Sequence, residues 1–197
     1  MTTAAKFDSY FVNHVELLHR PGERDLAIVF FETLGCTVTE LTDVFGARRR
    51  IFGVFAGTGE PDALNNVLYV SEFMEPERQI DDLLTRLTRD DEELRGAIEK
   101  HDQARRKPGD VTHFGLRFPS FEELAVVTDR LQHDLPAQLV GRVTVHPSAP
   151  VALPALGAEV NQAFVHTDVI GTGLFPFGQL IELQAQRPMG ERHARHR

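Results

Sequence analysis

The stretch VTHFGLRF at residues 111–118 alternates apolar side chains with other types around a histidine, which is typical of a β-strand with one buried face. The stretch VNHVELLH at residues 12–19 has the same form, with His14 in the place of His113. In both stretches the face opposite the histidine is largely apolar. We therefore expect each strand to pack its apolar face on a helix and to turn its histidine toward the concave side of a sheet.

A helix and three more strands are expected after the first histidine strand. A Pro-Gly turn ends that strand, and residues 23–34 then carry apolar side chains at helical spacing. Gly35 is a suitable residue to close this helix. The three strands expected after it lie at residues 37–41, 48–56 and 66–73.

The same order of elements follows the second histidine strand. Ser120, with Glu123 three residues later, predicts an N-terminal helix cap. The strands expected after this helix lie at residues 139–145, 161–167 and 177–184, with a loop at 146–157 between the first two. The chain therefore predicts two β-α-β-β-β modules, and an internal repeat is a strong guide to the whole fold.

The segment between the two repeats differs in composition. It is rich in Glu, Asp, Arg and Leu and predicts one or two amphipathic helices. We expect an α+β fold in which the modules form one curved, eight-stranded mixed sheet around a cavity. The predicted division is a first module at 1–75, a helical insert at 76–110, a second module at 111–186 and a disordered tail at 187–197.

Composition excludes several classes of protein. The net charge of −8 argues against a general nucleic-acid binder, which needs a basic face. No apolar run is long enough to cross a bilayer, and the single cysteine, Cys36, allows no disulfide framework within the chain. We therefore expect a cytoplasmic protein that acts on a small molecule, with no nucleic-acid or membrane partner.

Two histidines and two glutamates occupy equivalent ends of the two repeats. His14 and His113 open the modules, and Glu72 and Glu182 close them. A carboxylate within an apolar strand is costly to bury without a partner, and a metal ion is one such partner. Two imidazoles with one or two carboxylates suit Fe(II), Mn(II), Ni(II), Co(II) or Zn(II). The structural alternative is that each histidine is an ordinary strand residue.

The chain resembles the vicinal-oxygen-chelate superfamily of glyoxalases, bleomycin-resistance proteins and extradiol dioxygenases. The resemblance rests on Phe-Phe-Glu-Thr-Leu-Gly at residues 30–35, on the strand at 112–118, and on Phe-Gly-Gln-Leu-Ile-Glu-Leu at 177–183. It implies one divalent metal ion bound by His14, Glu72, His113 and Glu182. Glu75 is the competing candidate for the position given to Glu72.

The resemblance leaves three functions open. The first is a metal-dependent lyase or isomerase, in which Glu72 or Glu182 also acts as the base. The second is an Fe(II) extradiol-type dioxygenase, which needs only His14, His113 and Glu182 as ligands and for which His166 is the candidate acid–base residue. The third is a non-catalytic binding protein of the resistance type.

Three further residues are candidates for holding the substrate. Arg50 and Arg117 would bind an anionic group, and Phe164 would form an aromatic wall. The resemblance is compatible with pairing of the modules within one chain and with a homodimer.

Overall fold

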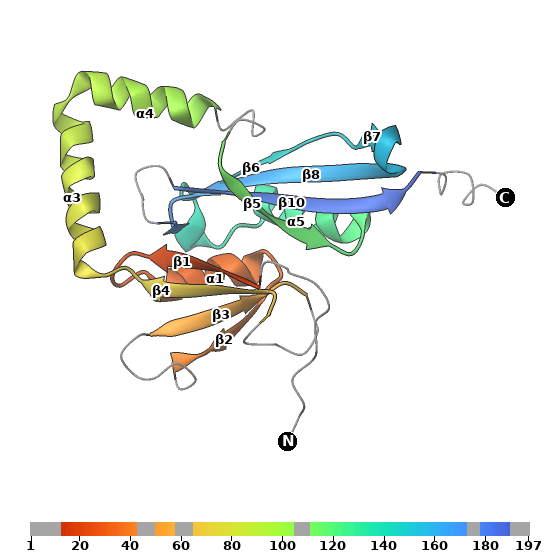
Figure 1. Cartoon of the computed structure of the whole chain (residues 1–197), viewed down its shortest axis with the longest axis horizontal. Helices are drawn as coiled ribbons and strands as arrows, with labels where there is room; N and C mark the ends of the chain where they lie inside the picture. Colours follow the sequence, from red (N-terminus) through yellow and green to blue (C-terminus); the bar gives the residue numbers. More distant parts are fainter. Residues whose placement is uncertain (1–12, 43–49, 58–64, 105–110, 173–177, 190–197) are drawn as a thin grey trace.

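The computed structural model describes residues 13–42, 50–57, 65–104, 111–172 and 178–189 of the 197-residue chain. Within these ranges the protein is an α+β structure with two mixed, open sheets of five strands each (Figure 1). None of the helices in these ranges is long and apolar enough to cross a lipid bilayer.

The first sheet, sheet A, has the strand order β2-β3-β4-β1-β9. Its central pair is β1 (His14–His19) and β4 (Val67–Glu72), which run parallel, and β3 (Ile51–Phe55) and β2 (Thr37–Glu40) follow as antiparallel neighbours. Helix α1 (Arg24–Thr33) joins β1 to β2. As expected, Gly35 follows this helix with a positive φ of 83°, a conformation that a glycine adopts without strain.

The second sheet, sheet B, repeats this order as β5-β10-β8-β6. β5 (His113–Phe118) runs parallel to β10 (Gln179–Pro188), and β8 (Ala158–Thr167) and β6 (Val143–Pro147) follow as antiparallel neighbours. Helix α5 (Phe121–His133) begins at the predicted cap, because the Ser120 hydroxyl oxygen accepts a hydrogen bond from the Glu123 backbone N–H at 3.1 Å.

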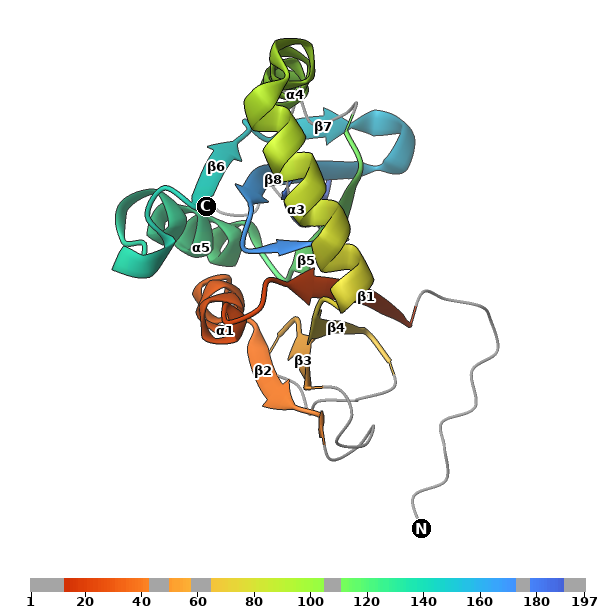
Figure 2. The same ribbon diagram turned by 90° about the vertical axis from the view of Figure 1, so that its left-hand side faces the viewer.

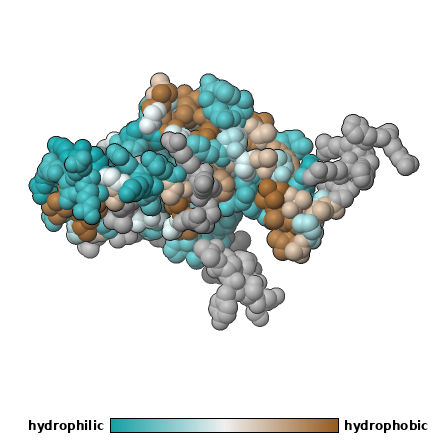
Figure 3. Space-filling model, turned by 90° about the horizontal axis from the view of Figure 1, so that it is seen from above, coloured by the Kyte–Doolittle hydropathy of each residue, from teal (hydrophilic) through white to brown (hydrophobic). Residues whose placement is uncertain are grey.

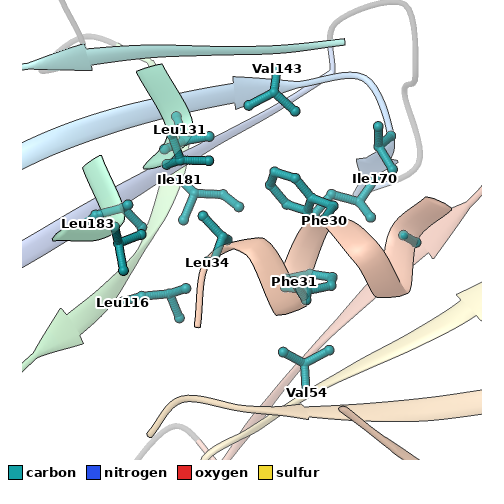
Figure 4. Packing of buried hydrophobic residues seen from close by; sticks show 14 of the residues in the cluster. Phe30, Phe31, Leu34, Val54, Leu116, Leu131, Val143, Ile170, Ile181 and Leu183 are labelled. Atoms are coloured by element: carbon teal, nitrogen blue, oxygen red, sulfur yellow. The ribbon is translucent and has the colours of Figure 1, made fainter. Parts of the chain in front are cut away.

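One core joins the two sheets. Helices α1 and α5 lie next to each other on the same side of the sheets (Figure 2), and their apolar faces meet the buried faces of both. Phe30 and Leu34 from the α1 region lie on the side of Ile181 in sheet B, and Phe31 points toward Val54 in sheet A (Figure 4). The predicted apolar faces of the two histidine strands are confirmed, since Leu17 and Leu116 both belong to this core.

The expectation of one continuous eight-stranded sheet is not met. The free edge of β1 pairs with β9 (Ile170–Gly171), a short strand that the sequence did not indicate, and sheet A therefore ends there. Two smaller differences lie in the second half. Residues 137–139 form a 3-10 turn, so β6 begins only at Val143, and β7 (Val151–Leu153) lies in the predicted loop and pairs with β8.

The insert contains two helices, as predicted. α3 (Glu75–Asp90) and α4 (Glu92–Ala104) form a bent projection at one end of the molecule (Figure 1). β10 continues to Pro188, two residues past the predicted end of the second module, and the remainder of the predicted tail from residue 190 lies outside the described residues.

Candidate functional site

Sheet B carries a polar face on the side away from the helices. Residues paired across neighbouring strands point to the same side of a sheet, so the register gives the members of this face. Three neighbouring strands, β5, β10 and β8, contribute one residue each to every row of this face. The three successive rows are His113, Leu180 and His166; Gly115, Glu182 and Phe164; and Arg117, Gln184 and Gln162. The sequence placed His113 and Glu182 on this face, and the structure brings them together.

His113 and Glu182 face each other at hydrogen-bonding distance. Nε2 of His113 lies 3.1 Å from Oε2 of Glu182, and Nδ1 lies 2.7 Å from the backbone oxygen of Val111. A carbonyl oxygen only accepts hydrogen bonds, so Nδ1 carries a proton. A neutral His113 therefore turns the Nε2 lone pair toward a carboxylate oxygen, and this arrangement requires a cation between the two atoms, either a second proton or a metal ion.

Two glutamines hold the other oxygen of Glu182. Gln162 and Gln184 each donate a hydrogen bond from Nε2 to Oε1 of Glu182, at 2.5 Å and 2.8 Å. Gln184 in turn accepts a hydrogen bond from Gln186 at 2.6 Å. Because both amides bind Oε1, the carboxylate is fixed with Oε2 directed at His113. The alternation of the last strand predicted that Gln184 shares the face of Glu182 but not that it binds the carboxylate, and no signal in the sequence pointed to Gln162.

The donor atoms fit a divalent metal ion. Two ligands at right angles, each about 2.1 Å from an ion, are about 3 Å apart, close to the 3.1 Å between His113 and Glu182. A hydrogen bond from the distal nitrogen of a histidine to a backbone carbonyl, as from His113 to Val111, is a usual support for a metal ligand.

His14 lies on the corresponding face of sheet A. It is exposed, its ring centre lies 5.0 Å from that of Tyr69, and its Nδ1 lies 2.9 Å from the side-chain oxygen of Asn13. With Nδ1 donating to Asn13, Nε2 is again the nitrogen available to a ligand. His14 and Gly115, the neighbour of Glu182 in the register, line one small cavity of about 250 Å³.

Glu72 does not join His14. Glu72 is level with His19, five residues beyond His14 along β1, or about 16 Å at 3.3 Å per residue. It also lies on the opposite face, since Val67 and Tyr69 share the face of His14 and Glu72 alternates with them. The predicted equivalence of Glu72 with Glu182 is therefore not observed.

Tyr69 holds the position in sheet A that corresponds to Glu182. In sheet A, His14 pairs with Val67, and Tyr69 lies two residues after Val67. In sheet B, His113 pairs with Leu180, and Glu182 lies two residues after Leu180. The sequence-based alignment differs from this by three residues (72 − 69), and an odd offset moves a side chain to the other face of a strand. The alternative candidate, Glu75, is the first residue of helix α3 and binds Arg78.

The other predicted residues are divided between two regions. Phe164 meets the His113 ring edge-on, with ring centres 5.9 Å apart, and His166 and Arg117 lie on the same polar face of sheet B. Arg50 instead lines a cavity of about 1160 Å³ whose wall also includes Glu16 and Glu72.

A second cavity lies beside His113. It has a volume of about 550 Å³, within the usual range for small-molecule sites, and its wall includes His113, Thr112, His101 and Gln179. Of the His113–Glu182 pair, only His113 lines this cavity.

The four predicted ligands do not form one cluster. Among the residues that the structure describes, no group of three or more His, Cys, Asp or Glu side chains is close enough to hold one metal ion. Comparisons with protein-family models, with curated proteins and with solved structures find no match to this chain. The resemblance to the vicinal-oxygen-chelate superfamily therefore stays a prediction.

Proposed function

We propose that the protein is a metal-dependent enzyme of the vicinal-oxygen-chelate type, in which His113 and Glu182 bind one divalent metal ion and His14 moves toward them to complete the ligand set, since the three side chains are not close enough to hold an ion in this structure. The observation that carries the proposal is the approach of Nε2 of His113 to Oε2 of Glu182, at 3.1 Å. Two histidines and one carboxylate form the set of protein ligands found in non-haem Fe(II) oxygenases.

His14 is proposed as the third ligand on three grounds. It lies on the sheet face turned away from the helices, it has Nε2 available, and it shares a cavity wall with Gly115. Gly115 matters because it has no side chain beside Glu182: a Cβ atom at this position would meet only one backbone oxygen, at 3.8 Å. The space between β1 and the His113–Glu182 pair is therefore not filled from β5.

The placement of Glu72 favours the dioxygenase type over the lyase or isomerase type. The latter was expected to use Glu72 as a fourth ligand, and it needs a carboxylate that can detach to act as a base. Glu72 lies on the other sheet face, and Glu182 is held by Gln162, Gln184 and His113 together. A fixed Glu182 suits a permanent ligand better than a mobile base.

The surrounding residues have roles that follow from their positions. A bound divalent ion would act as a Lewis acid for two neighbouring oxygens of the substrate. Phe164, next to His113, would contact the flat face or edge of an aromatic ring, and Arg117 would attract an anionic substituent. His166, on the same face, is the candidate for moving a substrate proton.

The first test is metal content. After anaerobic reconstitution with Fe(II), Mn(II), Ni(II), Co(II) or Zn(II), we expect about one ion per chain in the wild type. His113→Ala and Glu182→Gln should lose it, whereas Glu72→Gln and His133→Ala, at a 70% exposed side chain, should keep it. If the wild type binds no metal, the enzyme proposal is wrong, and a small-molecule-binding protein of the resistance type is the remaining interpretation.

The second test separates the two reactions. We expect Fe(II)-loaded protein to consume O₂ with catechol-type substrates and to show no activity on the thiol adducts of 2-oxoaldehydes. The opposite result, with loss of activity in Glu72→Gln, would restore the lyase or isomerase interpretation.

A further inference from the structure

Helix α3 exposes the apolar side of an amphipathic helix. Ile80, Leu83 and Leu87 are 49%, 46% and 50% exposed, and Leu84, which lies on the same side, is partly exposed. Spacings of three and four residues place these side chains in one stripe along the helix. From above, the insert is a mainly hydrophilic projection with hydrophobic side chains at its edge (Figure 3). The four side chains are called the α3 stripe below.

The body of the protein does not cover this stripe. Of the residues of α3, only Asp81 is buried, and it faces the body through an ion pair of 3.5 Å with Arg20. The main neighbour of α3 is α4, which continues from its end. A surface helix normally packs its apolar stripe on a core, and the α3 stripe has no such cover among the residues that the structure describes.

We propose that the α3 stripe pairs with the α3 stripe of a second copy of this chain, with the two helices antiparallel. The charges along α3 support this orientation. Apart from Asp81, which faces the body, residues 75–82 contain three carboxylates and one arginine, a net charge of −2, and residues 83–90 contain two arginines and one aspartate, a net charge of +1. Antiparallel pairing sets each acidic half beside a basic half, whereas parallel pairing sets the two acidic halves together.

The stripe is also self-complementary about its centre. A two-fold axis between Leu83 and Leu84 places Ile80 of one chain opposite Leu87 of the other and brings the two Leu83 side chains together. The helix dipoles are then opposed, which favours the same orientation. A helix of 16 residues is about 24 Å long, so the contact is smaller than a standard interface, and we expect a weak dimer.

The oligomeric state tests the surface. Sedimentation equilibrium of the whole chain at about 1 to about 200 μM should show a monomer–dimer equilibrium for the wild type. Leu83→Glu should raise the dimer Kd by about 100-fold or more, because it would bury two carboxylates against each other. Val126→Glu, at a 60% exposed valine on α5, is the matched control and should leave the Kd unchanged. A wild type that stays monomeric, or a dimer that Leu83→Glu does not weaken, overturns the proposal.

Disulfide cross-linking tests the orientation. A mixture of Ile80→Cys and Leu87→Cys should form a mixed dimer under mild oxidation, and each variant alone should cross-link poorly. Both variants also carry Cys36→Ser, because Cys36 is a free and partly exposed thiol. Efficient cross-linking of Ile80→Cys with itself would show parallel pairing and refute the antiparallel arrangement.

Discussion

The side-chain amide of Gln162 donates a hydrogen bond to Oε1 of Glu182 at 2.5 Å, from the strand next to the one that carries the glutamate. Gln184, on the glutamate's own strand, donates to the same oxygen. Two hydrogen bonds to Oε1 fix the orientation of the carboxylate and leave Oε2 as the oxygen that faces His113. The proposed ligand set therefore depends on residues that do not themselves bind metal.

Removal of these amides should weaken metal binding without removing a ligand. We expect Gln162→Leu to reduce metal affinity by about 10-fold, since loss of a group that orients a ligand typically has an effect of this size. Gln186→Leu is the control, because Gln186 contacts Gln184 and not Glu182. Competition with a chromophoric chelator measures both. Equal affinity in the wild type and Gln162→Leu would show that Glu182 needs no such support.

Arg142 joins the two halves of the chain. Its guanidinium binds Glu23, before α1, at 3.1 and 3.2 Å and Asp168, after β8, at 2.5 Å, and the hydrogen bonds to Glu23 and Asp168 raise its pKa. We expect Arg142→Met to lower the free energy of unfolding by about 1 kcal/mol, because it removes the arginine partner of Glu23 and leaves the 40% exposed Asp168 side chain with only Arg20, 3.8 Å away. Urea denaturation measures the change. Arg78→Met, which breaks an exposed pair within α3, should leave the midpoint nearly unchanged, and an equal effect of the two variants would contradict this account.

His19 should make the fold sensitive to acid. It is 1% exposed, its Nδ1 is bonded to the Arg20 carbonyl, and its Nε2 has no hydrogen-bond partner. Burial lowers the pKa of His19 from 6.5, against the opposing influence of Glu72. The unfolded chain therefore takes up a proton at a higher pH than the native protein, so this contribution to stability is complete above pH 6.5 and is lost as the pH falls toward the lower native pKa.

The variant His19→Phe tests this directly. The phenyl ring keeps the stacking on Phe52, where the ring centres are 6.2 Å apart, and removes the titration. We expect the difference in unfolding free energy between about pH 7.5 and about pH 5.5 to be smaller in this variant than in the wild type. His133→Phe, at an exposed site, should keep the wild-type difference. An unchanged pH dependence in His19→Phe would assign the acid sensitivity to other groups.

Two glycines with the same backbone conformation should respond differently to alanine. Gly178 and Gly157 have φ of +59° and +61°, so both variants bear the cost of a left-handed alanine, about 1 kcal/mol. At Gly157 an added Cβ atom meets nothing within 4 Å, but at Gly178 it would lie 2.5 Å from His166 Nε2 and 2.5 Å from the Thr167 carbonyl oxygen.

Gly178→Ala should therefore be the more destabilising variant. We expect a loss of about 3 kcal/mol or more for Gly178→Ala and about 1 kcal/mol for Gly157→Ala, measured by thermal or urea unfolding. Gly178→Ala should also displace the His166 ring and reduce any activity that depends on this histidine. Equal losses at the two positions would mean that the segment at Gly178 relaxes away from His166.

Much of the local structure follows from short-range patterns. Alternation in the two histidine strands predicted which side chains reach the core, and Leu17 and Leu116 are buried as expected. The Ser120 cap, Gly35 after α1 and the helical insert follow from residue types within a few positions. These features depend on neighbours in the chain, so the sequence contains the information that decides them.

The pairing of distant segments does not follow from such patterns. The strand at Ile170 and Gly171 has only two residues and forms because β1 offers an unpaired edge. The position of Glu72 depends on how β4 is aligned with β1, and a three-residue error in that alignment reversed its predicted face. The glutamines around Glu182 come together only because β8 and β10 pair in one particular register.

The sequence by itself determined the helices and the main strands, their order, and the repeat, but not the short strands β7 and β9. It also determined the sheet face on which His113 and Glu182 lie, because an alternating strand has only two faces and burial selects one. The tertiary structure alone decided which polar residues of that face touch, that Tyr69 and not Glu72 stands in the place equivalent to Glu182, and that the strands divide into two sheets. Register is the physical reason: it is set by the packing of all strands on one core and by hydrogen bonds between distant segments, and no local pattern specifies either.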